Sequence, residues 1–148
     1  MITDILSKLY VRELSTLQNE LHLYSDETIL WKVSNGISNS AGNLALHLVG
    51  NLNHFIGAKL GNTGYVRQRD LEFSDKNIPL KTLIEQIDTI KIMIPDVLSK
   101  LTSEDLMREI QLSENHPVIT TELFLGHLLA HLSYHLGQVN YHRRLLDN

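Results

Sequence analysis

Apolar residues recur along most of the chain with the period of amphipathic helices. Residues 3–24 carry leucine and isoleucine at helical intervals, and the Thr3 hydroxyl can cap the start of this first helix. A second helix is predicted over residues 40–60. It ends at residues 61–64, where two glycines and an asparagine supply a stop signal. The first half of the chain therefore predicts two long helices.

Two more long helices are predicted in the second half of the chain. Pro79 suits the first turn of a helix over residues 79–101, whereas Pro95 is expected to kink that helix or end it early. The last helix is predicted to start at Thr120 or Thr121 and to run through the histidine-rich C-terminal stretch. Each of these helices has one apolar face, so each needs partners to cover it.

Shorter segments connect the four helices. Residues 25–40 and 62–77 are rich in polar, charged and turn-forming residues and are predicted to be loops. Residues 102–110 are predicted to form a short capped turn of helix. The sequence thus predicts an all-α protein, a left-handed four-helix bundle with a short extra helical segment between helices three and four, and a single domain spanning residues 1–148.

Histidine recurs every four residues on the last helix. At about 100° per residue, His127, His135 and His142 all lie within about 40° of His131 around the helix axis. This stripe borders the apolar face that must pack inward. Gln138 lies on the same stripe, about 20° from His131.

The second helix repeats this pattern around His47, because Asn43, Asn51 and His54 lie within about 40° of it. Inward-facing polar groups cost free energy unless something satisfies them, and one metal ion satisfies several imidazoles at once. Two histidines four residues apart, together with His47, would form a three-histidine site. The alternative is that each histidine is separately hydrogen-bonded at the edge of the core.

The spacing leaves two pairs on the last helix equally suitable, His127 with His131 and His131 with His135. Three neutral imidazoles leave an ion its full charge and at least one open position, which is typical of catalytic zinc sites. Zinc is the first choice of metal and nickel the second, because imidazole ligands suit both.

Composition excludes several classes of function. A net charge of −4 without a concentrated basic patch argues against a nucleic-acid partner. No apolar run approaches the ~20 residues needed to cross a bilayer, and the N-terminus lacks the pattern of a signal peptide, so we expect a cytoplasmic protein with no membrane partner. The chain has no cysteine, so any thiol chemistry needs an external thiol.

The phrases HLLAHLSYHLGQ on the last helix and NLALHLVGNLNHF on the second resemble the DinB/YfiT-like family of metal-binding four-helix bundles. That family has an H-x-x-x-H pair followed by Gly-Gln, which here matches His131, His135 and Gln138. Its third ligand is a histidine within the second helix, which matches His47. The resemblance therefore implies that His47, His131 and His135 bind a divalent metal, and that His127 lies in the second shell or the cavity. It assigns no role to His54 or His142.

The resemblance also implies a class of reaction. Characterised members of that family include metal-dependent thiol S-transferases, so the partners implied are a low-molecular-weight thiol and an electrophilic small molecule. Metal-assisted hydrolysis is a second enzymatic interpretation, and a non-catalytic, dimeric metal-binding or stress-response protein is a third. A deep pocket beside the metal would favour an enzyme, whereas a fourth protein ligand such as His127 would favour a structural metal.

Other residues have a structural and a functional interpretation. Asn43, Asn51 and Gln138 are candidates to orient the imidazoles. Arg67 and Arg69 could bind an anionic substrate group, but ion pairs with Asp70 or Glu72 are favoured, and Trp31 is interpreted as a core anchor. A strip of small residues lies opposite the histidines and fits either packing within the chain or a homodimer interface; it consists of Gly126, Ala130, Ser133 and Gly137.

Overall fold

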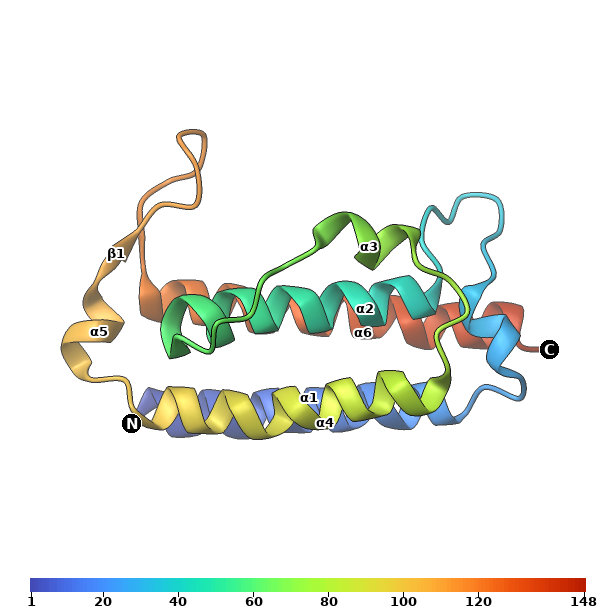
Figure 1. Cartoon of the computed structure of the whole chain (residues 1–148), viewed down its shortest axis with the longest axis horizontal. Coiled ribbons are helices and arrows are strands. Elements are labelled where there is room, and N and C mark those ends of the chain that lie inside the picture. Colours follow the sequence, from blue (N-terminus) through green and yellow to red (C-terminus); the bar gives the residue numbers. More distant parts are fainter.

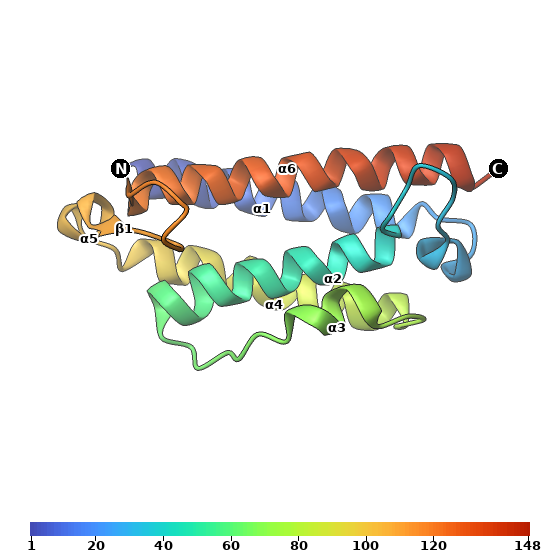
Figure 2. The same ribbon diagram turned by 90° about the horizontal axis from the view of Figure 1, so that it is seen from above.

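Four long helices form the body of the protein in a computed structural model that describes all residues, 1–148. Their bounds are α1 Ile2–His22, α2 Ala41–Leu52, α4 Leu80–Ser99 and α6 Thr121–Leu146. A π-helical segment, η2 Asn53–Leu60, continues α2. Figures 1 and 2 show a four-cornered bundle in which α1 lies beside α4 and α6, and α2 lies beside the same two helices. The predicted all-α four-helix bundle is confirmed.

The core lies on the bundle axis and is built from the apolar stripes of the four helices. On α1 the stripe consists of Leu6, Tyr10, Leu14, Leu17 and Leu21, all buried at helical spacing. Burying one such leucine is worth about 1.5–3 kcal/mol, so this stripe alone fixes which face of α1 turns inward. The one polar atom in it is satisfied, because the Tyr10 hydroxyl donates to the Leu125 carbonyl at 2.6 Å.

Helix caps match the sequence prediction at most starts, but not at the first. Ser40, Thr102 and Thr120 accept backbone N–H bonds as N-caps of α2, α5 and α6. Thr3, expected to cap α1, is instead buried inside the helix, which begins at Ile2. The Met1 amine donates to the Asp4 carboxylate at 2.8 Å, so an ionic contact closes this end in place of a hydroxyl cap.

Proline inside α4 has a smaller effect than expected. The helix does not end at Pro95 but continues to Ser99. Val97 and Leu98 beyond the proline are buried in the core. Their burial offsets the loss of one backbone hydrogen bond at the proline.

Both predicted loops contain short helices. A 3₁₀ helix, η1 Glu27–Trp31, begins at the Asp26 cap, and α3 Arg69–Ser74 lies over α2 (Figure 2). The predicted extra segment between helices three and four is α5 Ser103–Met107. It is followed by an antiparallel pair of two-residue strands, β1 Glu109–Ile110 and β2 Ile119–Thr120. No helix combines the length and apolarity needed to cross a membrane.

Candidate metal centre

Three imidazoles converge where α2 packs against α6. His131 Nε2 lies 3.2 Å from His47 Nε2 and 3.1 Å from His135 Nε2. Each of the three residues offers one ligand atom, and these atoms all lie within 4.8 Å of one another. The structure thus brings together the trio that the sequence predicted, and this trio could hold a metal ion. We call it the histidine trio.

Hydrogen bonds orient two of the three rings from behind. His47 Nδ1 lies 3.0 Å from Glu72 Oε1, and His135 Nδ1 lies 2.7 Å from Gln138 Oε1. A carboxylate and an amide oxygen can only accept, so both Nδ1 atoms carry the proton and both Nε2 atoms present a lone pair. The third ring differs, because His131 Nδ1 is buried without a partner.

Burial keeps two of the three rings in the neutral, ligating form. The pKa of His131 is lowered to about 4, first by burial and then by the neighbouring imidazoles of His135 and His47. The pKa of His47 is also lowered, mainly because the ring is buried. Both imidazoles are therefore uncharged near neutral pH, and the uncharged imidazole is the form that binds a metal.

The arrangement of donor atoms fits a cation. The Nε2 atoms of His47 and His135 both face His131 Nε2, at 3.2 and 3.1 Å, so a single proton on His131 Nε2 serves only one of these contacts well, whereas a cation between the rings serves both. Two ligands bound at about 2.0–2.1 Å in tetrahedral geometry lie about 3.3 Å apart, close to the distances found here. The donor set and its spacing are therefore compatible with a metal ion held by the three rings.

Glu72 is the residue at this site that the sequence analysis did not identify as a partner of the trio. Its side chain is 6% exposed, and Arg67 binds both of its oxygens at 2.8 Å. The expected ion pair between Arg67 and Glu72 is thus present, but it is buried against His47 and not on the surface. The guanidinium fixes the carboxylate that in turn orients the His47 ring.

Gly50, one turn after His47 on α2, makes room for this carboxylate. A Cβ atom added at Gly50 would lie 2.0 Å from Glu72 Oε2, far inside contact distance. Asn43 fixes the backbone of the same segment, because its amide donates to the carbonyls of Glu72 and Asp75 at 3.0 and 2.9 Å. Asn43 therefore supports the trio through α3 and makes no direct bond to an imidazole.

The other predicted site residues lie outside the trio. Asn51 is buried on α2, with its Oδ1 lacking a partner. His127 is exposed and stacks on Phe124 at 6.4 Å. His142 is buried elsewhere, between the Tyr24 hydroxyl and the Lys32 carbonyl, as expected for a core histidine.

Three further predictions concern packing. The Arg69 guanidinium lies 5.3 Å from the Phe73 ring and does not form the ion pair with Asp70 or Glu72 that was expected. Trp31 packs against the core, and its ring would meet a Cβ atom at Gly42 at 2.7 Å. The small-residue strip is open at its two glycines, since a Cβ added at Gly126 or Gly137 would meet nothing within 4 Å, whereas Ser133 donates to Glu13 of α1 at 3.2 Å.

Comparison with known proteins supports the fold and identifies the family. No curated protein matches the chain. Among solved structures it is similar to a DinB-like protein from Bacillus cereus ATCC 10987, with 20% identity, a TM-score of 0.65, and coverage of 90% of this chain and 85% of the other. The family described as "Protein of unknown function (DUF1572)" matches residues 5–148. The chain has a DinB-like fold and belongs to this DinB-like family.

Proposed function

We propose that the protein binds one divalent metal ion per chain through His47, His131 and His135. The observation that carries this proposal is the convergence of three Nε2 atoms, two contacts of which measure 3.1 and 3.2 Å. Glu72 and Gln138 hold two of the rings in the ligating tautomer, and Arg67 keeps Glu72 in place. Such supporting partners commonly change metal affinity 10- to 100-fold.

The metal we propose is zinc, with nickel as the second choice. Three neutral nitrogen ligands suit both ions, so the ligand type does not separate them. His127 is exposed and directed at Phe124, so it does not supply a fourth ligand. A site with three protein ligands retains an open side for a further ligand, which is the arrangement of catalytic rather than structural zinc.

We further propose that the protein is a metal-dependent transferase of the thiol S-transferase type. A bound divalent cation would supply a Lewis acid that favours the thiolate form of a small external thiol. The chain itself has no cysteine, so the nucleophile comes from a low-molecular-weight thiol and the acceptor is an electrophilic small molecule. His47 and His135 are oriented by Glu72 and Gln138 and would hold the ion in one position.

Glu72 supports this choice over metal-assisted hydrolysis. A divalent metal can acidify its bound water by itself, but hydrolysis is faster where a free general base takes the proton. Both oxygens of Glu72 are occupied, Oε1 by His47 and Arg67 and Oε2 by Arg67. A thiol loses its proton more readily than water does, because its ordinary pKa is about 8.5, much lower than that of water.

Metal analysis and a thiol-conjugation assay test the two parts of the proposal separately. Mass-spectrometric metal analysis of the purified chain is expected to give about one zinc or nickel per chain, and His131→Ala to remove it. His127→Ala is the matched control on the same helix and should retain the metal. Metal content that is unchanged in His131→Ala would remove the basis for the site. If metal binds but a panel of small thiols and electrophiles gives no conjugate, the site stands and the transferase proposal is wrong.

A further inference from the structure

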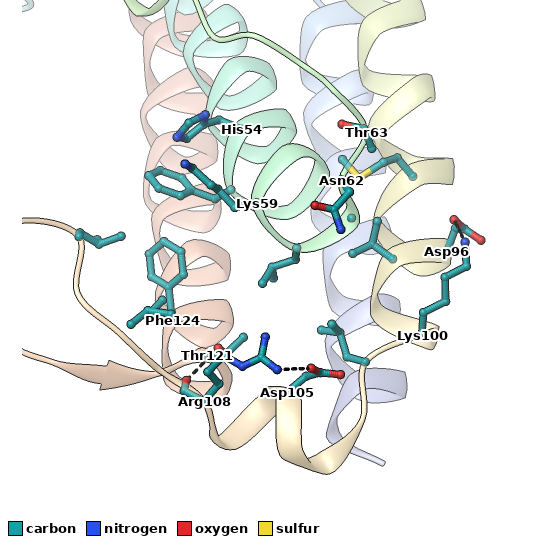
Figure 3. A pocket seen from close by; sticks show the side chains of 18 of the residues that line it. His54, Lys59, Asn62, Thr63, Asp96, Lys100, Asp105, Arg108, Thr121 and Phe124 are labelled. Atoms are coloured by element: carbon teal, nitrogen blue, oxygen red, sulfur yellow. Dashed lines mark hydrogen bonds and ion pairs between the residues drawn. The ribbon is translucent and has the colours of Figure 1, made fainter.

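A large cavity lies at one end of the bundle, and none of the histidine trio lines it. It has a volume of about 1020 Å³ and is enclosed by η2, the second half of α4, the α5–β1 segment and the start of α6 (Figure 3). We call it the end cleft. Cavities of about 300–1,000 Å³ are typical of small-molecule sites, so the end cleft has room for a ligand.

One wall of the end cleft is apolar and aromatic. Phe55 of η2 and Phe124 of α6 meet edge to face at 5.1 Å between ring centroids. Leu60, Val97 and Leu101 continue this wall toward α4. Such a wall favours an alkyl chain or an aromatic ring, because each buried methylene group contributes about 0.8 kcal/mol.

The rim of the end cleft carries more positive than negative charge. Lys100 pairs with Asp96 at 2.6 Å, and Arg108 pairs with Asp105 at 3.1 Å. Lys59 lines the same cleft and makes no ion pair. Two carboxylates thus balance two of the three cations, and one positive charge is left over. In Figure 3 the leftover cation, Lys59, lies across the cleft from the Asp96–Lys100 pair.

His54 stands beside Lys59 on the same side of the cleft (Figure 3). Burial lowers the pKa of His54, and the positive charges of Arg67 and Lys59 lower it further. The ring is therefore neutral near pH 7 and adds a hydrogen-bonding group without a second charge. A ligand with one negative charge matches this rim, whereas a dianion would leave a charge unpaired.

We propose that the end cleft binds an amphipathic monoanion, a carboxylate carried on an alkyl or aryl group. The carboxylate pairs with Lys59 beside His54, and the apolar part lies against Phe55 and Phe124. This inference goes beyond the proposed metal function, because none of the contacts that carry it involves the histidine trio.

The end cleft and the trio are nevertheless neighbours along the same two helices. His54 follows His47 by seven residues, and Phe124 precedes His131 by seven, so each lies about 10 Å further along its helix. Phe55 links the two regions, since the Arg67 guanidinium that holds Glu72 lies 6.0 Å from its ring.

Calorimetric titration of the full chain with decanoate tests the inference. Decyltrimethylammonium is the matched probe, with an alkyl chain one methylene group longer and the opposite charge. Decanoate is expected to bind, decyltrimethylammonium to bind at least tenfold more weakly, and affinity to rise about two- to fourfold per methylene group from hexanoate to decanoate. Amide chemical shifts should change at residues 59–63, 97–101 and 108–112. Because the inference is independent of the metal, the affinity should agree within about twofold with one equivalent of zinc and with a chelator.

Two exposed positions allow variants that leave the core intact. Lys59→Glu should weaken decanoate binding about tenfold, since it reverses the one unpaired cation. Lys81→Glu, a charge reversal at another exposed lysine outside the cleft, should have no effect. Leu112→Glu, which adds a negative charge at a half-exposed position of the lining, should also weaken binding. Equal binding of both probes, equal affinities of Lys59→Glu and Lys81→Glu, or shifts confined to other residues would each overturn the inference.

Discussion

Replacing Gly50 with alanine tests how the histidine trio is held. The added Cβ would lie 2.0 Å from Glu72 Oε2 and 2.5 Å from its Cδ, so the carboxylate must move. This movement breaks the geometry of three contacts at once, two with Arg67 at 2.8 Å and one with His47 at 3.0 Å. Gly50→Ala should therefore destabilise the protein and weaken its metal binding.

The expected change in the free energy of unfolding is opposite in sign to that of an ordinary glycine-to-alanine substitution in a helix. Alanine is favoured over glycine by about 1 kcal/mol in a helix interior. Removing one partner of a buried ion pair costs about 3–5 kcal/mol. Glu72 is displaced and not removed, so a cost of about 2–3 kcal/mol is reasonable, within the range of overpacking a buried site. The net result is a loss of about 1–2 kcal/mol in the free energy of unfolding.

Urea denaturation followed by circular dichroism measures this difference, and a competitive zinc titration measures the affinity. Gly126→Ala is the matched control, because a Cβ there meets nothing within 4 Å and the helix-propensity gain should appear alone. We expect Gly126→Ala to stabilise the protein by about 0.5–1 kcal/mol without changing zinc affinity. Gly50→Ala should lower that affinity about 10- to 100-fold, as is typical for loss of an orienting partner.

A double-mutant cycle identifies the cause. In a Glu72→Ala background the obstructing carboxylate is gone, so adding Gly50→Ala should recover the ordinary gain of about 1 kcal/mol. The reasoning is refuted if Gly50→Ala stabilises the wild-type chain as much as Gly126→Ala does. It is also refuted if the cost of Gly50→Ala is the same with and without Glu72.

Three further predictions concern the trio and the exposed face of α6. His135→Ala should cost far more metal affinity than His127→Ala in an equilibrium titration at fixed pH, because His127 is exposed and outside the trio; the reverse order would move the site by one turn. In metal-free protein, the free energy of unfolding should fall as the pH is lowered from about 6.5 toward about 4. The folded state holds His131 neutral with a pKa of about 4, so the unfolded state takes up the proton first as the pH falls. A free energy of unfolding that rises on acidification in this range would contradict the prediction. If the small-residue strip forms a homodimer interface, light scattering should give twice the chain mass of 16.9 kDa. Ala130→Arg should reduce the measured mass to that of one chain, and a monomeric wild-type protein would exclude the dimer.

Periodicity was enough to predict the four helices and the histidine-bearing face of α2 and of α6. An i, i+4 pair on one helix face is a local property, so spacing alone identified His131 as paired with either His127 or His135. Spacing could not choose between the two candidate pairs on α6; that choice rested on the Gly-Gln phrase after His135. The structure brings His135, and not His127, beside His131 and His47.

Glu72 could not be identified as a partner of His47 from the sequence. It lies 25 residues from His47, in a charged stretch where no apolar period indicates the six-residue helix α3. Its position depends on long-range contacts, namely the Asn43 amide and the space at Gly50. The end cleft was missed for the same reason, because it forms where the ends of several elements meet.

The connection between η2 and α4 joins the trio to an exposed part of the chain. Arg67 and Glu72 in this connection hold His47, while Val66 beside them is 80% exposed. Ligand binding stabilises whichever conformation it favours, and this coupling is reciprocal. A metal ion on the trio therefore also favours the conformation of the connection in which Arg67 and Glu72 hold His47. The factor is the same as the one by which this conformation raises the affinity for the metal. Proteolytic cleavage near Val66 would then report metal occupancy, with the loaded protein cut more slowly than the metal-free one.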